Sequence, residues 1–316
     1  MKEKYYNAGI IENIGNVKLN LTYYNGQDGY SDGAVEDELL EIVCSSPSDL
    51  TKVIYEKASW PVLYHMSEER QYLLEWYPFK KDASILEIGA GCGALTGCMC
   101  RKAKTVKAIE LSKKRSMINA YKNKEATNLE IMVGNFSDIY PHLNRKFDYV
   151  TLIGVLEYAV SYIAGENPFV EMLSGINECL AEEGKIIVAI ENRFGLKYFA
   201  GCREDHLGVP FVGIEGYSNR SAKVQTFNKS ELEKLLSAAG FSKWKFYYPY
   251  PDYKFPNSIF SDDFLPKKGE LMDNIRNFDA SRLVLFDETS AFDAIIEAGN
   301  FPEFSNSFLI VIERRS

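Results

Sequence analysis

Residues 85–97, with the sequence ILEIGAGCGALTG, constrain the fold of this chain more than any other segment. The apolar run 85–88 is followed by Gly89, Gly91 and Gly93 at alternate positions. Such a run is typical of a buried parallel strand, and such glycines are typical of a turn into a helix. Glycine at the turn lets a ligand approach the backbone more closely than a β-carbon would allow. The segment therefore predicts a strand–turn–helix unit that binds a nucleoside-containing cofactor.

Strands and helices are predicted to alternate from residue 84 onward. The expected strands are 85–88, 105–109, 129–133, 149–153, 185–190, 243–248 and 308–312, and the expected helices are 95–102, 113–122, 169–180 and 229–239. Before them we expect a strand at 17–24, a helix at 36–43 and a helix that Ser67 caps. Repeated strand–helix units predict an α/β fold, a doubly wound and mainly parallel sheet with helices on both faces.

Two stretches interrupt this alternation, at about 192–228 and 251–306. Both follow strands whose carboxyl ends face the ligand crevice of a doubly wound sheet, so we expect both to form a lid on the cofactor side. Prolines 249, 251 and 256 argue against a continuous central strand in the aromatic segment 241–260. The predicted organisation is an N-terminal extension or cap (1–80), a core (81–250) with the insertion 192–228, a lid insertion (251–306) and a last core strand (307–316).

Polar residues at strand ends are the candidate cofactor ligands. Glu110 ends the second strand, where a carboxylate can accept hydrogen bonds from both ribose hydroxyls. Asn135 ends the third strand and can bond the adenine amino group, with Asp138 as the alternative, while Phe136 can pack on the base. Gly154, after the fourth strand, again permits close approach. The same glycines also satisfy the dinucleotide fingerprint, so a nicotinamide cofactor is an alternative.

Four segments in this order carry a family resemblance: ILEIGAGCG, KAIELS, VGNF and FDYVTLIGVLEY. With them the chain resembles the class I S-adenosylmethionine-dependent methyltransferases. The resemblance implies a Rossmann-like seven-stranded sheet in the order 3-2-1-4-5-7-6, with strand seven antiparallel. It implies S-adenosyl-L-methionine as cofactor and S-adenosyl-L-homocysteine as product. The implied cofactor-lining residues are Glu87, Gly89, Ala90, Gly91, Gly93, Glu110, Leu111, Asn135, Phe136, Gly154, Leu156 and Glu157.

Arg70 is a further candidate, because its guanidinium can pair with the carboxylate of the cofactor; an ion pair on the helix surface is the alternative. A narrower resemblance, in strings such as AIENRFGLKYFAG and YYPYPDYKFP, is to bacterial predicted methyltransferases, some of which accompany surface-polysaccharide genes.

The candidate catalytic residues are His206, Glu191 and Tyr158. Methyl transfer to a hydroxyl requires a base, and His206 follows two acids that can orient its ring. A surface-loop role for His206 and helix packing for Tyr158 are the alternatives. Consecutive residues seldom converge on one ion, so Glu204, Asp205 and His206 are not expected to bind a metal, and no metal is expected elsewhere.

Composition restricts the binding partners and the cellular location that we expect. The net charge of −8 disfavours a nonspecific nucleic-acid binder, so we expect a small-molecule or saccharide acceptor and no nucleic acid. The sequence shows no apolar run that would insert into a membrane and no signal peptide, so a cytoplasmic protein with reduced cysteines is expected. A non-catalytic cofactor-binding scaffold and a nicotinamide-dependent oxidoreductase remain alternatives, and the oligomeric state is open.

Overall fold

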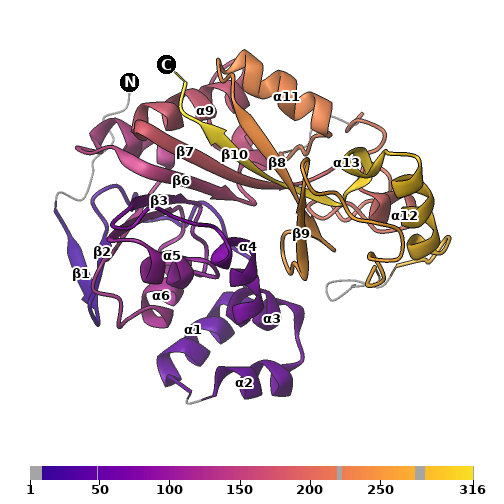
Figure 1. Ribbon diagram of the computed structural model, residues 1–316. Coiled ribbons are helices and arrows are strands. Elements are labelled where there is room, and N and C mark those ends of the chain that lie inside the picture. The colour runs from indigo at the N-terminus through magenta and orange to yellow at the C-terminus, as the bar shows by residue number, and fades with distance from the viewer. Residues whose placement is uncertain (1–8, 48, 219–222, 275–281, 316) are drawn as a thin grey trace. The chain divides into compact units, whose positions relative to one another are not determined.

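The structure, a computed structural model (Figure 1), describes residues 9–47, 49–218, 223–274 and 282–315. The described chain divides into two compact units. The first comprises Met1–Thr151 and Glu178–Gly184, and the second comprises Leu152–Asn177 and Lys185–Ser316. Parts of the predicted extension, of both insertions and of the last segment lie outside the described residues, at 1–8, 48, 219–222, 275–281 and 316.

The first unit contains a sheet and a group of helices. Its strands are β1 (Ile11–Ile14), β2 (Val17–Asn20), β3 (Ser84–Ile88), β4 (Thr105–Glu110), β5 (Leu129–Val133) and most of β6 (Phe147–Ile153). Its helices are α1 (Val35–Ser45), α2 (Leu50–Lys57), α3 (Trp60–Met66), η1 (Glu68–Gln71), α4 (Tyr72–Glu75), α5 (Thr96–Lys102), α6 (Lys113–Lys122), α7 (Phe136–Ile139) and η2 (Tyr140–His142).

Buried apolar strands build this sheet. Every residue of β3 is buried, as expected of a central strand covered on both faces. The strand order is β1-β2-β5-β4-β3-β6. The pairs β3–β4, β4–β5 and β2–β5 are parallel, and β1–β2 is an antiparallel pair. Because parallel strands end at one edge, the turns after β3, β4 and β5 meet there.

The N-terminal helices pack beside the glycine turn. Figure 1 shows α1, α2 and α3 as one helical group. Leu39 of α1 and Val62 of α3 share a buried apolar cluster with Cys92 of the turn and Ile118 of α6. Burial of these side chains fixes the N-terminal segment against the turn, at about 1.5–3 kcal/mol for each large aliphatic side chain.

The second unit begins within β6. Its strands are most of β7 (Leu180–Glu191), β8 (Trp244–Tyr250), β9 (Ser258–Ser261) and β10 (Ser307–Glu313). Its helices are η3 (Leu156–Tyr158), α8 (Ala159–Tyr162), most of α9 (Pro168–Cys179), α10 (Leu196–Phe199), α11 (Lys229–Ala238), α12 (Glu288–Glu297) and α13 (Phe301–Phe304). The strand order is β7-β10-β8-β9, with antiparallel pairs throughout.

The predicted fold class is confirmed, with differences in detail. The described residues form ten strands: the seven of the predicted sheet, β2, which was predicted only as a separate N-terminal strand at 17–24, and β1 and β9, which were not predicted. The seven predicted strands keep their predicted neighbours within each unit, and β10 is antiparallel to both β7 and β8. The domain boundaries at 80, 250 and 306 stay predictions.

Two local predictions were wrong. The strand expected at 17–24 ends at Asn20, where the Thr22 amide donates to the Asn20 side chain and turns the backbone. The strand expected to end at Tyr248 continues through Pro249 to Tyr250. Pro249 has no N–H to donate to a neighbouring strand. It lies in the part of β8 that pairs with the short strand β9 (247–250), beyond the part that pairs with β10 (244–247).

Candidate active site

The turn after β3 depends on glycine for its backbone conformation. Gly89, Gly91 and Gly93 have φ angles of 71°, 53° and 77°, in the left-handed region that other residues rarely adopt. A β-carbon at Gly93 would lie 2.3 Å from Oδ1 of Asn119. The turn therefore needs glycine for its own geometry, in addition to any approach of a ligand.

Glu110 connects this turn to the next helix. Its carboxylate is buried at the end of β4. Oε2 accepts a hydrogen bond from the Gly91 amide at 2.8 Å, and Oε1 accepts one from the Ser112 amide at 3.1 Å. Ala90 is buried in the turn and Leu111 is half-buried after Glu110. The structure thus brings together the predicted residues that follow β3 and β4.

Glu87 lies beneath the turn rather than at its surface. Its buried Oε2 accepts a hydrogen bond from Oγ1 of Thr96 at 2.6 Å, and the Asn119 amide donates to the same hydroxyl at 3.0 Å. Burial raises the pKa of Glu87 to about 8. The side chain is therefore a neutral acid at neutral pH and ties the end of β3 to the start of α5.

Sequence reasoning missed an ionic network from the N-terminal segment. Arg115 of α6 pairs with Asp32 at 3.1 Å, and His65 Nε2 lies 3.6 Å from the same carboxylate. The pKa of Asp32 falls to about 2, chiefly through its hydrogen bond with His65, and burial lowers the pKa of His65 to about 4. No local pattern reveals this network, because its members come from three separate segments.

Asn135, Phe136 and Arg70 make local contacts. Asn135 caps α7, its Oδ1 accepting from the Ser137 amide at 3.0 Å. Phe136 is buried and stacks on Tyr140 with ring centroids 5.1 Å apart. Arg70 is buried with its guanidinium 4.1 Å from the centre of the Tyr64 ring. Their assignment to the cofactor stays a prediction.

In the second unit, the turn after β6 presents a buried carboxylate. Gly154 has a φ of 69°, and its amide donates to Ala189 of β7 at 2.9 Å. Leu156 and Glu157 are both buried. Tyr158 packs its ring edge-on against His206, with centroids 5.3 Å apart.

Glu157, Glu191 and His206 come together in the second unit. Nε2 of His206 lies 3.4 Å from Oε1 of Glu157 and 3.8 Å from Oε2 of Glu191. On the other side of the ring, Nδ1 lies 2.9 Å from Oε1 of Glu204. The structure thus assembles all three predicted catalytic residues, with Tyr158 against the imidazole.

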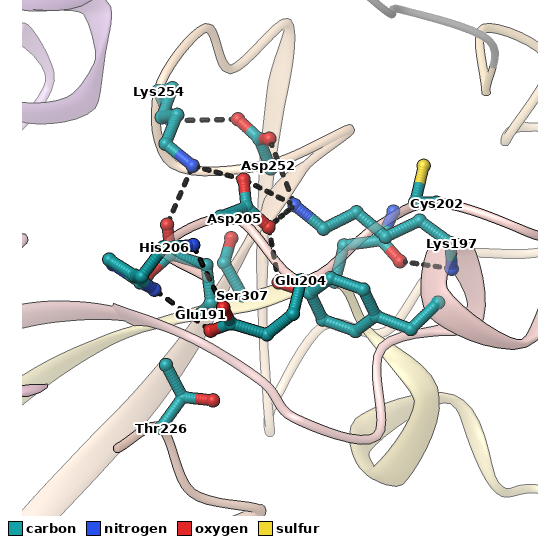
Figure 2. Close-up of polar contacts among 12 residues, drawn as sticks. Glu191, Lys197, Cys202, Glu204, Asp205, His206, Thr226, Asp252, Lys254 and Ser307 are labelled. Atoms are coloured by element: carbon teal, nitrogen blue, oxygen red, sulfur yellow. Dashed lines mark hydrogen bonds and ion pairs between the residues drawn. The ribbon is translucent and has the colours of Figure 1, made fainter. Parts of the chain in front are cut away.

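Two lysines complete this cluster, and sequence reasoning missed both (Figure 2). Lys254 donates to Oε1 of Glu191 at 2.6 Å and also bonds Asp205. Lys197 pairs with Asp205 at 2.9 Å and lies 3.6 Å from Asp252. The only sequence signal was the position of both lysines within the two insertions, which meet at this cluster.

The electrostatics of the cluster set its proton chemistry. The pKa of His206 lies well above 6.5, because the nearby carboxylates Glu191, Glu157 and Glu204 outweigh the effect of burial. Burial raises the pKa of Glu157. A raised pKa favours the protonated imidazole, so Glu157 is a second candidate for the proton acceptor, and the role of His206 as base stays a prediction.

Four further side chains of the second unit have structural partners. Arg193 forms two 2.7 Å hydrogen bonds with Glu231 and one with the Gly213 carbonyl. Tyr217 is buried and its hydroxyl donates to Glu204 at 3.1 Å. Tyr248 and Tyr250 are buried among aromatic side chains. These contacts place Arg193 and Tyr217 in the packing of the first insertion, and Tyr248 and Tyr250 in the packing of β8.

Comparison with known proteins supplies the family. A family model described as a methyltransferase domain matches residues 61–245, more than half of the chain. Ribosomal RNA small subunit methyltransferase A of Borreliella afzelii (strain PKo) is 25% identical over 238 residues, covering 74% of this chain and 80% of that protein. The protein of the same name from Borreliella burgdorferi (strain ZS7) is 28% identical over 232 residues, covering 72% and 77%.

The solved structures that resemble this chain share less sequence identity with it. A SAM-dependent methyltransferase from Archaeoglobus fulgidus is 16% identical with a TM-score of 0.48, covering 84% of this chain and all (100%) of that one. Phosphoethanolamine N-methyltransferase 1 of Haemonchus contortus is 14% identical with a TM-score of 0.46, covering 91% and 50%.

Proposed function

The chain belongs to the methyltransferase domain family, and we propose that it methylates an oxygen or nitrogen of a small-molecule or saccharide acceptor. Its methyl donor is S-adenosyl-L-methionine, and S-adenosyl-L-homocysteine is the product. The family membership removes the nicotinamide-dependent oxidoreductase as an alternative. Among the described residues, no helix combines the length and apolar character needed to cross a membrane.

The cofactor is proposed to bind at the turns after β3, β4 and β5. Positive φ angles at Gly89, Gly91 and Gly93 support this proposal, since they turn the backbone without side chains in the way. Glu110 supports it as well. Each carboxylate oxygen has two acceptor positions, so ribose hydroxyls can bond to Glu110 while the Gly91 and Ser112 amides remain bonded.

The proposed acceptor class rests on the net charge of the ionisable cluster in the second unit. Its described ionisable groups are the carboxylates of Glu157, Glu191, Glu204, Asp205 and Asp252 and the cations Lys197, Lys254 and His206. Five acids against three bases leave an excess of negative charge. Such a cluster favours a neutral or cationic acceptor and disfavours a polyanion.

A hydroxyl acceptor must lose a proton, and this cluster contains a suitable acceptor for it. Neither oxygen of Glu157 accepts a hydrogen bond of normal geometry within the described residues, Nε2 of His206 lies 3.4 Å from Oε1, and burial raises the pKa of the carboxyl. We infer that Glu157 receives the proton and that His206 and Glu191 stabilise the charge. The two insertions, which contribute His206 and Lys254, are proposed to form the lid over the acceptor.

Methylation of ribosomal RNA is the second candidate. It rests on the two curated relatives named above, which match nearly three quarters of this chain. The acidic cluster and the net charge of −8 oppose it, because a nucleic-acid site must compensate phosphate charge.

One labelling experiment separates these candidates. Purified protein is incubated with methyl-labelled S-adenosylmethionine and either a low-molecular-weight cell extract or total RNA. We expect label in small, acid-soluble products, and nuclease-sensitive label in RNA would overturn the proposed acceptor class. Glu157→Gln should lower turnover by about 10²-fold or more with cofactor affinity unchanged. Glu215→Gln, which removes an exposed carboxylate of the same unit, is the matched control.

A further inference from the structure

We propose that Glu157, Glu191 and His206 bind one divalent transition-metal ion of the Mn²⁺ or Zn²⁺ type. The three residues come from separate segments: the turn after β6, the end of β7 and the first insertion. Each offers one ligand atom, and these atoms all lie within 4.8 Å of one another. Metal binding would be a property of this cluster beyond the methyl transfer itself.

The separations fit a shared ion. Ligands held about 2.1 Å from a tetrahedral ion lie roughly 3.4 Å from each other. Nε2 of His206 is 3.4 Å from Oε1 of Glu157 and 3.8 Å from Oε2 of Glu191. Small side-chain adjustments would bring all three atoms to coordination distance of one point.

The carboxylates provide an observation independent of this spacing. Glu157 and Glu191 are both 0% exposed. Both oxygens of Glu157 and Oε2 of Glu191 are buried without a hydrogen-bond partner among the described residues. Buried carboxylate oxygens are costly without a partner, and a metal ion would satisfy them.

The remaining atoms of the cluster orient the ligands. Oε1 of Glu191 is engaged by Lys254 at 2.6 Å and by the Tyr253 hydroxyl at 3.1 Å, which leaves Oε2 for an ion. Nδ1 of His206 lies 2.9 Å from Glu204, a carboxylate that can only accept, so Nδ1 carries the hydrogen. Metal-binding histidines are usually held by such a partner, with the other ring nitrogen on the metal. The ion would displace a proton from Nε2, because histidine binds metal in its neutral form.

The set of donors indicates which ion binds. One imidazole and two carboxylates suit Zn²⁺, Mn²⁺ or Fe²⁺, whereas Ca²⁺ and Mg²⁺ prefer sites made entirely of oxygen. Three protein ligands leave coordination positions open. If the proposed function holds, one of these positions can take the acceptor hydroxyl and lower its pKa. Because Glu157 offers the ion one oxygen, its other oxygen can still receive the hydroxyl proton.

The experiment measures the metal and needs no acceptor. Full-length protein without a purification tag is freed of metal by chelator and dialysed against MnCl₂ or ZnCl₂. We expect about one ion per chain by elemental analysis, a higher melting temperature with metal, and an altered electron paramagnetic resonance spectrum of bound Mn²⁺. Because binding is read without turnover, a failed acceptor assignment leaves this result intact.

Variants decide whether the ion lies at this cluster. Glu157→Gln should reduce the bound metal at least tenfold, while the amide keeps the size of the side chain and one acceptor oxygen near His206. His206→Gln should have the same effect, while Glu215→Gln should bind metal as the parent does. The proposal is overturned if the parent retains less than about one tenth of an ion per chain, or if folded Glu157→Gln and His206→Gln retain the full amount.

Discussion

Glu87 links the sequence motif to a measurable property of the folded protein. Its carboxyl accepts a hydrogen bond from Thr96 in a buried position, and burial raises its pKa to about 8 from an ordinary 4.5. Between these values the folded protein holds a proton that the unfolded chain releases. Its contribution to stability is therefore fully present below pH 4.5 and is lost as pH rises through about 8.

Replacement of this residue should change the pH dependence of stability. The free energy of unfolding should fall, through this group alone, by up to about 1.4 kcal/mol per pH unit between pH 5 and 8. In Glu87→Gln that component should disappear, so the difference between parent and variant should vary with pH. Urea unfolding at several pH values measures it. Glu125→Gln, at an exposed position, should keep the parent slope, and an equal slope in Glu87→Gln would contradict the assignment.

A second prediction for a single residue concerns Glu110 and cofactor binding. Glu110→Ala should weaken binding of S-adenosylhomocysteine by tenfold or more, since charge-assisted hydrogen bonds contribute about 1.5–3 kcal/mol each. Calorimetric titration gives the affinity, with Glu125→Ala as control. Because Glu110 also bonds the Gly91 and Ser112 amides, Glu110→Gln, which keeps one acceptor oxygen, guards against loss of the turn. An affinity within twofold of the parent in both variants would reject the ribose contact.

At the scale of elements, the turn between β3 and α5 must keep its left-handed backbone. Gly93→Ala forces φ of +77° on alanine and places its β-carbon 2.3 Å from Asn119. We expect a loss of about 1–3 kcal/mol in stability from the backbone alone, and more from the clash. Gly29→Ala is the control, because its φ is not left-handed and its β-carbon would lie 3.8 Å from Leu111. Equal thermal melting of the two variants would contradict the strained-turn reading.

Some helices and strands could be predicted from the sequence alone, and others could not. The helix predicted at 113–122 is α6 itself, because Ser112 caps it locally, its side chain accepting a hydrogen bond from the Arg115 amide. The capped helix α11 was equally predictable from Asn228 and Glu231. In contrast, β9 and α12 lie in the second insertion, where no repeating unit predicts an element.

The candidate site likewise contains some residues that the sequence identified and others that it did not. Glu191, His206 and Tyr158 were identifiable, because each follows a recognisable strand or acidic motif. Lys197 and Lys254 were not, because their partners Asp205 and Glu191 are reached only when two insertions fold onto each other. The pairing that sets the charge of the cluster is therefore a tertiary property.

At the scale of the whole molecule, charge determines which partners can bind without specific contacts. The chain has 36 basic and 44 acidic residues, for a net charge of −8. Even its most basic run is neutralised: Lys113 pairs with Glu12 at 3.1 Å, and Lys114 pairs with Asp37 at 2.7 Å. Neighbouring Arg115 pairs with Asp32. These side chains are engaged by acids and are poorly placed to neutralise phosphates.

We therefore expect no saturable binding of a ribosomal RNA fragment at physiological salt up to about 10⁻⁴ M protein, the weak end of nonspecific affinity. Filter binding at several salt concentrations measures this. The double variant Lys113→Ala, Lys114→Ala should behave as the parent does, since both lysines are already paired. Micromolar binding with a steep salt dependence in the parent, lost in the double variant, would instead show a phosphate-binding surface on α6. RNA would then become the leading acceptor despite the acidic composition of the chain.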